Sequence, residues 1–279
     1  MRVTASTRVA GVIGSPVRHS LSPALHNAAF AAAGVPWVYV AFDVAAGEAH
    51  RALDAMRVLG IGGLSVTMPH KEQVAASVDE LAPAAAALRS VNTVVRRADG
   101  LLEGHSTDGD GFVASLREAG VDPRDRRVVV VGAGAAGRAV VDALARAGAG
   151  AIDVVGRDPA RAAVAAQLAG PVGRVADEAA IERADIVVNA TSVGMGSDEL
   201  PFDATLLGAR QVVADLVYHP LDTALLRAAR KAGAAAVDGL GMLVHQAALQ
   251  QGLWLGAVPD TAVMRAAALR ELDARTQVA

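Results

Sequence analysis

A glycine-rich segment offers the clearest chemistry in this sequence. The apolar run Val128–Val131 leads directly into Gly132–Gly137, which has the pattern G-x-G-x-x-G between an expected strand and an expected helix. In this pattern the first glycine permits a tight turn, the second lets the backbone approach a pyrophosphate, and the third lets helix and strand pack closely. We therefore predict a dinucleotide site, with phosphates at the helix N-terminus, formed by Gly132, Gly134, Ala135, Ala136 and Gly137. An ordinary turn between a strand and a helix is the alternative.

Charged residues after the next strand bear on which dinucleotide is bound. Ala151–Val155 is followed by Gly156, Arg157 and Asp158, and Arg161 lies one helical turn further on. An acidic residue at this point binds the ribose 2′-OH of NAD, whereas an arginine suits the 2′-phosphate of NADP. Arg157 and Arg161 thus favour NADP, while Asp158 leaves NAD as an alternative. Asp158 is equally suited to cap the helix that begins at Pro159.

Short polar motifs follow one another along the chain. In order they are His19–Pro23, Ser65–Lys71, Val91–Thr93, Ser106–Gly109, then, after the glycine-rich segment, Asn189–Met195, Asp215–Tyr218 and Gly239–Gln246. Taken singly, each has a structural explanation. Ser20 and Ser22 can cap a helix, Asp108 can close a turn before Gly109, and Lys71 can be a solvated surface lysine.

Taken together, these seven motifs resemble the shikimate dehydrogenase family over essentially the whole chain. The resemblance implies the reversible, NADPH-dependent reduction of 3-dehydroshikimate to shikimate, within chorismate and aromatic amino acid biosynthesis. It implies that Lys71 and Asp108 are catalytic. The residues that it assigns to the substrate are Ser20, Ser22, Thr67, Lys71, Asn92, Asp108, Tyr218 and Gln246. The further residues that it places along the cofactor are Asn189, Thr191, Met195, Leu216 and Gly239.

The chemistry of that reaction agrees with these assignments. A small polyhydroxylated ring with one carboxylate needs several short polar groups converging on it. Reduction of a ketone produces an alkoxide, which needs a proton donor or a cation beside it. Lys71, held in place by Asp108, would supply that proton, while the hydride comes from the cofactor.

Departures from the family pattern keep other substrates open. Ser65 and Ser106 stand where the family usually has asparagine, and these shorter side chains would enlarge the pocket or leave room for a water. Gly156 and Asp158 replace the usual flanks of the arginine. A quinate or dual quinate/shikimate dehydrogenase using NAD or NADP is therefore an alternative, and aminoshikimate is a further candidate substrate. A non-catalytic cofactor-binding regulator is an alternative of another class, against which Lys71 and Asp108 together argue.

Alternating elements must position these residues. Short β-branched runs alternate with longer Ala-rich amphipathic runs, which is typical of α/β proteins. In the first part we expect strands at Arg8–Ile13, Val38–Phe42 and Gly63–Thr67, helices at Pro23–Ala33 and Gly47–Leu59, a helix opened by Pro69, and a hairpin from Asn92–Val95 and the segment after Gly100. In the second part we expect strands at Arg127–Val131, Ala151–Val155, Ile186–Ala190 and Val212–Leu216, and helices at Ala135–Ala147 and Arg161–Leu168. Two C-terminal helices are expected at Gly241–Gly252 and Thr261–Ala274.

This order predicts two domains. Residues 1–108 would form a substrate-binding and catalytic α/β domain, and residues 109–239 a Rossmann-like, doubly wound NADP-binding domain. Residues 240–279 would pack back onto the first domain.

Composition limits the remaining possibilities. The chain has 279 residues, 53% of them hydrophobic, and a net charge of −3, so we expect a globular protein that binds neither nucleic acid nor membranes. It has no cysteine, which excludes disulfides and thiolate chemistry. The histidines lack the spacing of metal ligands, so no metal is expected. We expect a cytoplasmic monomer or homodimer acting on a small-molecule substrate.

Overall fold

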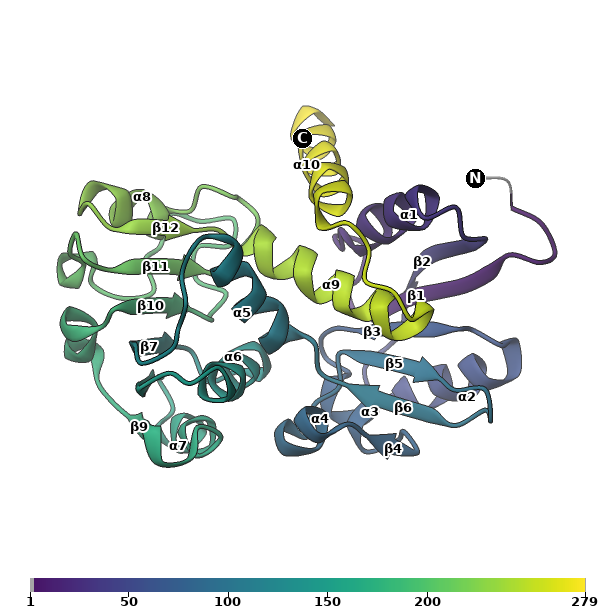
Figure 1. Ribbon diagram of the computed structural model, residues 1–279, viewed down its shortest axis with the longest axis horizontal. Coiled ribbons are helices and arrows are strands. Elements are labelled where there is room, and N and C mark those ends of the chain that lie inside the picture. The colour runs from purple at the N-terminus through teal and green to yellow at the C-terminus, as the bar shows by residue number, and fades with distance from the viewer. Residues whose placement is uncertain (1–2, 279) are drawn as a thin grey trace. The chain divides into compact units, whose positions relative to one another are not determined.

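The computed structural model describes residues 3–278, and the chain divides into two compact units. One unit takes the chain up to Thr107 and again from Gln246 onward, and the other takes Asp108–His245. The chain passes from the first unit to the second after Thr107, one residue before the predicted boundary at residue 108. The chain returns to the first unit after His245, inside helix α9 (Gly239–Leu255), whereas the prediction placed this return at residue 240. Each unit contains its own six-stranded sheet (Figure 1).

The sheet of the first unit has the strand order β2-β1-β3-β5-β6-β4. Its strands are β1 (Arg8–Gly14), β2 (Trp37–Asp43), β3 (Gly63–Val66), β4 (Glu80–Leu81), β5 (Thr93–Arg96) and β6 (Leu102–His105). Strands β1, β2 and β3 pair in parallel, and the predicted hairpin is confirmed as the antiparallel pair β5–β6. Strand β5 is also antiparallel to β3.

Helices and apolar clusters stabilise this sheet. The helices are α1 (Ser22–Ala32), α2 (Ala49–Leu59), α3 (Lys71–Ala75), α4 (Pro83–Leu88), the part of α9 from Gln246, and α10 (Thr261–Val278). Helix α2 buries Leu53 and Met56 in a cluster with Ile13 and Leu64 of the sheet. Helix α10 packs against α1, which lies far from it in sequence.

The prediction that Pro69 opens a helix is wrong. The peptide bond between Met68 and Pro69 is cis, and His70 donates its backbone N–H to the Thr67 carbonyl over 3.0 Å. Residues 67–70 therefore form a turn, and α3 begins only at Lys71.

The second unit has the Rossmann arrangement that the sequence predicts. Its strand order is β12-β11-β10-β7-β8-β9, and all neighbours are parallel. The strands are β7 (Arg127–Val131), β8 (Ala151–Val155), β9 (Gly173–Val175), β10 (Ile186–Asn189), β11 (Val212–Asp215) and β12 (Ala235–Val237). The helical elements are α5 (Asp108–Glu118), α6 (Ala135–Arg146), α7 (Pro159–Gln167), α8 (Ala224–Lys231), η1 (Gly170–Val172), η2 (Glu178–Arg183) and η3 (Ala204–Leu206), with α9 up to His245.

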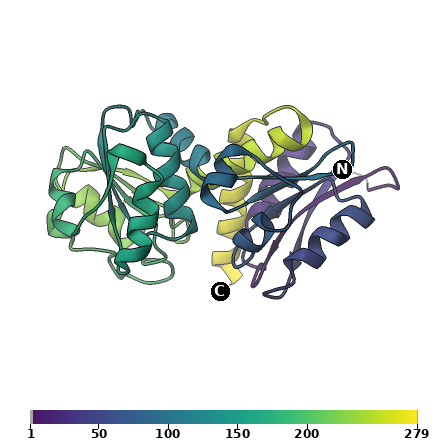
Figure 2. The same ribbon diagram turned by 90° about the horizontal axis from the view of Figure 1, so that it is seen from below.

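Helices cover both faces of this sheet, as the two views show (Figures 1 and 2). Val128 and Val130 of β7 belong to the apolar cluster that includes α5, α6 and α7. Val129 and Val131 belong to the cluster on the other face, with residues of η2 and α8. The unbroken valine run of β7 is explained by this burial on both sides.

None of the helices in residues 3–278 combines the length and the apolar character that a membrane crossing requires.

Candidate active site

Most of the predicted substrate residues of the first unit come from segments that meet at one edge of its sheet. The carboxyl ends of the parallel strands β1 and β3 lie side by side, with Ile13 opposite Val66. Ser65 pairs with Thr93 at the start of β5, and Thr93 pairs with His105 at the end of β6. The segments that carry Ser20, Thr67, Lys71 and Asn92 therefore leave the sheet at the same edge.

The serine segment between β1 and α1 is held by the C-terminal helix. Ser22 is buried, and its backbone N–H donates to the Ser20 hydroxyl oxygen over 3.2 Å. The guanidinium of Arg275, on α10, donates to the backbone carbonyls of His19 (2.7 Å) and Ser20 (3.2 Å). No serine side chain caps α1, whose N-cap residue is Leu21. Arg275 was not identified from the sequence, because its contact with this segment joins opposite ends of the chain.

Lys71 directly follows the turn after β3. It opens α3, its side chain is half-buried, and its backbone carbonyl accepts the Val91 N–H over 3.0 Å. Thr67 is tied to β1 by its own N–H, which donates to the Ile13 carbonyl over 2.9 Å. The lysine is thus held by its backbone next to the segment that carries Asn92.

Asn92 is the centre of a buried polar cluster. Its Oδ1 accepts the Thr107 N–H and the Thr93 hydroxyl, each over 2.8 Å, and its Nδ2 donates to Thr107 Oγ1 over 2.9 Å. Thr107 in turn donates its hydroxyl to the backbone carbonyl of Gln246 over 3.2 Å. Asn92 is only 3% exposed. These bonds fix its orientation far more tightly than a surface turn residue requires.

Ser65, which stands where the family usually has asparagine, is buried and hydrogen-bonded. Its hydroxyl accepts from the Tyr39 hydroxyl over 2.6 Å and donates to Gln250 Oε1 over 2.7 Å. Gln250 follows the predicted substrate residue Gln246 by one turn of α9, and both glutamines are buried. Neither Tyr39 nor Gln250 was singled out from the sequence.

The glycine-rich loop of the second unit fits a bound pyrophosphate. Gly132 has a φ of 110°, and a Cβ on it would lie 2.9 Å from the Ala190 carbonyl. A Cβ on Gly137 would collide with the Gly132 carbonyl oxygen, whereas one on Gly134 would meet nothing within 4 Å. Gly134 is the N-cap of α6, so open space adjoins the free N–H groups of the helix start. The loop lies where β7 and β10 are neighbours, the switch point of the sheet.

The structure shows a helix-capping role for Asp158. Its Oδ1 accepts the backbone N–H groups of Ala160 (2.9 Å) and Arg161 (3.2 Å), which caps α7. Arg157 and Arg161 are exposed, and within residues 3–278 neither guanidinium has a hydrogen bond or ion pair. The acidic side chain is therefore engaged with the helix, and two cations remain at the end of β8.

The loop after β10 is shaped by a buried network. Asn189 is fully buried; its Nδ2 donates to Asp215 (2.9 Å), and its Oδ1 accepts the Thr191 hydroxyl (2.7 Å). Asp215 also accepts the Thr223 hydroxyl over 2.7 Å. Burial raises the pKa of Asp215, and its hydrogen bonds with Thr223, Val217 and Asn189 oppose that rise.

The other residues predicted along the cofactor differ in exposure. Met195 is 56% exposed, and Thr191 is half-buried. Gly239 is buried, and a Cβ on it would lie 2.6 Å from the Leu216 carbonyl oxygen. The network around Asn189 and the close packing of Gly239 give both residues a structural role. Thr191 and Met195 are more accessible to a ligand.

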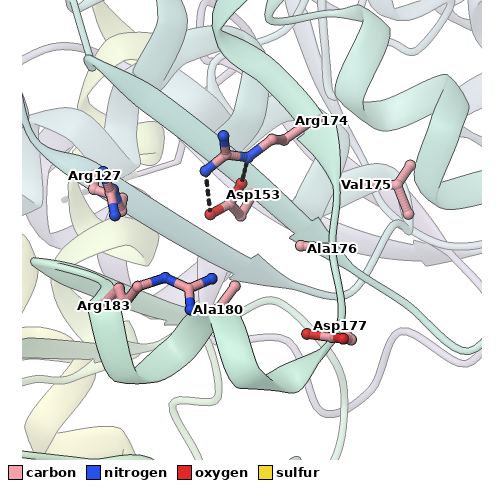
Figure 3. Close-up of a pocket in the computed structure, with 8 residues that line it drawn as sticks. All are labelled: Arg127, Asp153, Arg174, Val175, Ala176, Asp177, Ala180 and Arg183. Atoms are coloured by element: carbon pink, nitrogen blue, oxygen red, sulfur yellow. Dashed lines mark hydrogen bonds and ion pairs between the residues drawn. The ribbon is translucent and has the colours of Figure 1, made fainter.

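A hollow of about 750 Å³ opens elsewhere on the second unit (Figure 3). An ion pair between Arg174 and the buried Asp153 lies within it. It is lined by Arg127, Asp153, Arg174, Val175, Ala176, Asp177, Ala180 and Arg183. None of the predicted site residues lines this hollow, so it does not belong to the candidate site.

Across the described part of the chain, no three His, Asp or Glu side chains gather closely enough to hold a metal ion.

The parallel sheet, its order and the glycine-rich loop at the switch point define a dinucleotide-binding protein of the α/β class. Three family models match the sequence. The substrate-binding domain of shikimate dehydrogenase matches residues 12–94, shikimate/quinate 5-dehydrogenase matches residues 115–195, and the C-terminal domain of shikimate 5′-dehydrogenase matches residues 239–269. The chain belongs to the shikimate dehydrogenase family.

Individual relatives cover almost the whole chain. The shikimate dehydrogenase (NADP+) of Moorella thermoacetica is 45% identical over 276 residues, which cover 95% of this chain and 93% of that protein. The shikimate 5-dehydrogenase of Thermus thermophilus, solved with NADP(H) and shikimate, has a TM-score of 0.90 and 37% identity, covering 95% of this chain and 99% of that one. The quinate dehydrogenase of Corynebacterium glutamicum, solved with NAD, has a TM-score of 0.88 and 36% identity, with the same coverage.

Proposed function

We propose that this chain is a biosynthetic enzyme that reduces 3-dehydroshikimate to shikimate with NADPH, reversibly, within aromatic amino acid biosynthesis. The observation that carries the proposal is the set of hydroxyl and amide side chains on segments that meet at one edge of the first unit's sheet, in a chain 45% identical to an NADP+-dependent shikimate dehydrogenase. Such a set suits a small ring acid with several hydroxyl groups.

The roles of the substrate residues follow from their chemistry. Ser20 and Ser22 each have an O–H that can donate to a carboxylate, and Arg275 fixes the backbone of their segment. Thr67, Asn92 and Gln246 offer donors and acceptors to ring hydroxyls. Tyr218, on the loop after β11, is a further residue that we propose for the substrate, through its hydroxyl group.

The proton in the reaction comes from Lys71. When bound, the cofactor supplies the hydride. Lys71 donates a proton to the oxygen that the reduction leaves on the ring, and Asp108 is the second residue that we propose as catalytic. A lysine suits this task because its ammonium both stabilises a developing alkoxide and can protonate it.

NADP is the cofactor that the second unit suits. The helix start at Gly134 would hold the pyrophosphate, and Arg157 and Arg161 would hold the 2′-phosphate. Asp158 does not oppose this, because its carboxylate caps α7.

Arg157→Ala tests this cofactor preference. We expect Kd for NADP to rise roughly tenfold or more while Kd for NAD changes little, because only NADP has the 2′-phosphate that the Arg157 guanidinium would pair with. Titration of each cofactor against the variant measures this. Arg183→Ala, which removes an exposed arginine from the end of η2, is the control. Equal losses for NADP and NAD would remove Arg157 from the phosphate site.

The decisive assay follows the absorbance of reduced cofactor with shikimate and quinate, each combined with NADP and NAD. The proposal expects strong activity only with shikimate and NADP. The likeness to a quinate dehydrogenase solved with NAD favours a broader enzyme as the second candidate, and comparable rates with quinate or NAD would establish it. Cofactor binding without turnover of any ring acid would instead identify a regulator.

The proposal requires no macromolecular partner. A monomer or homodimer stays a prediction, which sedimentation of the purified protein tests.

A further inference from the structure

A chain of buried hydrogen bonds runs behind the predicted substrate residues of the first unit. Tyr39 donates its hydroxyl proton to Ser65 Oγ (2.6 Å), Ser65 donates to Gln250 Oε1 (2.7 Å), and Gln250 Nε2 donates to the Asn92 backbone carbonyl (3.3 Å). None of these four residues is more than 6% exposed. Each polar group is therefore costly to leave without its partner.

The direction of this chain is fixed by the donors and acceptors available. A backbone carbonyl can only accept, so the NH2 group of Gln250 faces Asn92 and its oxygen faces Ser65. The single hydroxyl proton of Ser65 then goes to that oxygen, and Ser65 must accept from Tyr39. Only one arrangement of the three side chains satisfies every bond, so each fixes the orientation of the next.

The far end of the chain is the Asn92 segment. The Asn92 carbonyl also accepts the Val66 N–H over 2.7 Å, which ties it to β3. One turn earlier on α9, the Gln246 carbonyl accepts the hydroxyl of Thr107, which itself holds the Asn92 side chain. Helix α9 thus holds this segment at two points, one through the backbone of Gln246 and one through the side chain of Gln250.

The near end of the chain is anchored by ring packing. Tyr39 stacks on the His26 ring, with centroids 4.2 Å apart and planes 13° apart, and both rings lie near Trp254. The tyrosine hydroxyl therefore has a fixed position from which to donate. Ser65, its acceptor, lies in β3, two residues before Thr67.

We propose that Tyr39, Ser65 and Gln250 are positioning residues that hold Asn92, Gln246 and Thr67 in the geometry that binds the ring hydroxyls of the substrate. The inference rests on the proposed function, because it takes those three residues as substrate-binding. Its consequence is specific: breaking this series of hydrogen bonds weakens substrate binding, while cofactor binding by the other unit and the rate of the chemical step change little.

Two neighbouring glutamines provide a matched test. Gln251, next to Gln250 on α9, is fully buried and donates to His26 Nδ1 (3.1 Å) and to the His26 carbonyl (3.0 Å), whereas only Gln250 bonds Ser65 and Asn92. Gln250→Leu and Gln251→Leu therefore each remove one buried amide from the same helix. We expect Gln250→Leu to raise KM for shikimate roughly tenfold, with kcat and Kd for NADP within about threefold of the parent values. Gln251→Leu is expected to lower the melting temperature but to leave KM unchanged.

Two further variants distinguish a role in positioning the substrate residues from a general loss of stability. Gln250→Glu keeps an acceptor for Ser65 but donates to Asn92 only when its carboxyl group is protonated, so its KM is expected to fall as pH is lowered relative to the parent profile. Tyr39→Phe is expected to raise KM in the parent protein, and to raise it less in the Gln250→Leu background, since the two act through Ser65.

The outcomes distinguish this inference from the function on which it rests. If the parent protein neither binds shikimate in calorimetry nor oxidises it, the proposed function fails and the inference fails with it. If the parent is active but Gln250→Leu and Gln251→Leu have the same KM, the inference alone is overturned. A pH-independent ratio of KM between Gln250→Glu and the parent would also contradict it.

Discussion

At the scale of single residues, this protein relies on short polar side chains whose partners are fixed by the fold. Asn92 and Asn189 each use both ends of the amide in buried hydrogen bonds. Asp158 has two possible roles by its position in the sequence, and the structure shows one of them. Its place at the end of β8 is that of a ribose ligand, yet its carboxylate caps α7. Arg157 and Arg161, both exposed, are the charged side chains that we propose for the 2′-phosphate.

Lys71 is the residue on which the proposed chemistry depends most. Lys71→Ala is expected to lower kcat by roughly 10²–10⁴, the range for loss of a general acid, with folding intact because only the side chain beyond Cβ is lost. Steady-state rates with shikimate and NADP, together with the melting temperature, measure this. The sequence contains one other lysine, Lys231, exposed at the end of α8, and Lys231→Ala is the matched control. Near-normal turnover in Lys71→Ala would remove the assignment.

At the scale of elements, the glycine-rich loop must both pack closely against its own backbone and leave space for a pyrophosphate. Substitutions at two different glycines can separate these requirements. Gly137→Ala places a methyl group against the Gly132 carbonyl, so we expect a loss of roughly 1–3 kcal/mol in the free energy of unfolding, as for other overpacked sites. Gly134→Ala meets open space and is expected to cost less than about 1 kcal/mol. It should nevertheless weaken NADP binding, because its methyl group occupies the approach to the helix start.

Urea unfolding and NADP titration of the two glycine variants test this separation. A Gly134→Ala protein that binds NADP as tightly as the parent would show that the pyrophosphate does not approach this glycine. The reverse pattern, with stability lost only in Gly134→Ala, would contradict the packing role of Gly137.

The sequence predicts elements best where burial and periodicity agree. Strands β7 and β8 were predicted with their observed bounds, because each is a short apolar run ending at a glycine. Helix α5 was missed, since Gly109 and Gly111 in its first turns argue against a helix. Packing explains Gly109, because a Cβ there would collide with the Ala139 carbonyl of α6. Local sequence carries no sign of such a long-range contact.

In the candidate site, too, local motifs could be predicted from the sequence and long-range contacts could not. Ser20, Lys71 and Asn92 lie in short motifs and were therefore proposed from the sequence. Tyr39 and Gln250 were not, because Tyr39 lies within β2, Gln250 lies within α9, and their partners are far away in the sequence. An isolated tyrosine in a strand predicts packing, and an isolated glutamine in a helix predicts exposure.

At the scale of the whole molecule, the two units have differently built cores. The second unit is packed mainly with Val, Ala, Ile and Leu, and each face of its sheet buries small side chains. The first unit instead has an aromatic cluster that contains Phe30, Trp37, Tyr39 and Trp254. His26 packs against the rings of Phe30, Tyr39 and Trp254 and is fully buried. A titratable ring in such a place couples the stability of the fold to pH.

Burial lowers the pKa of His26 to about 3, while the ordinary value is 6.5. Between these values the unfolded chain binds a proton that the folded chain does not, so stability is lost as pH falls from about 6.5 toward 3, by up to about 1.4 kcal/mol per pH unit. His26→Phe keeps a ring and removes the titration, so its free energy of unfolding should fall less over this range. Urea unfolding at pH 7, 6 and 5 measures the difference, with exposed His50→Phe as the control. Acidic groups titrate in every variant and cancel in the comparison. Parallel curves for the parent and His26→Phe would show that His26 is protonated in the folded protein as readily as in the unfolded one.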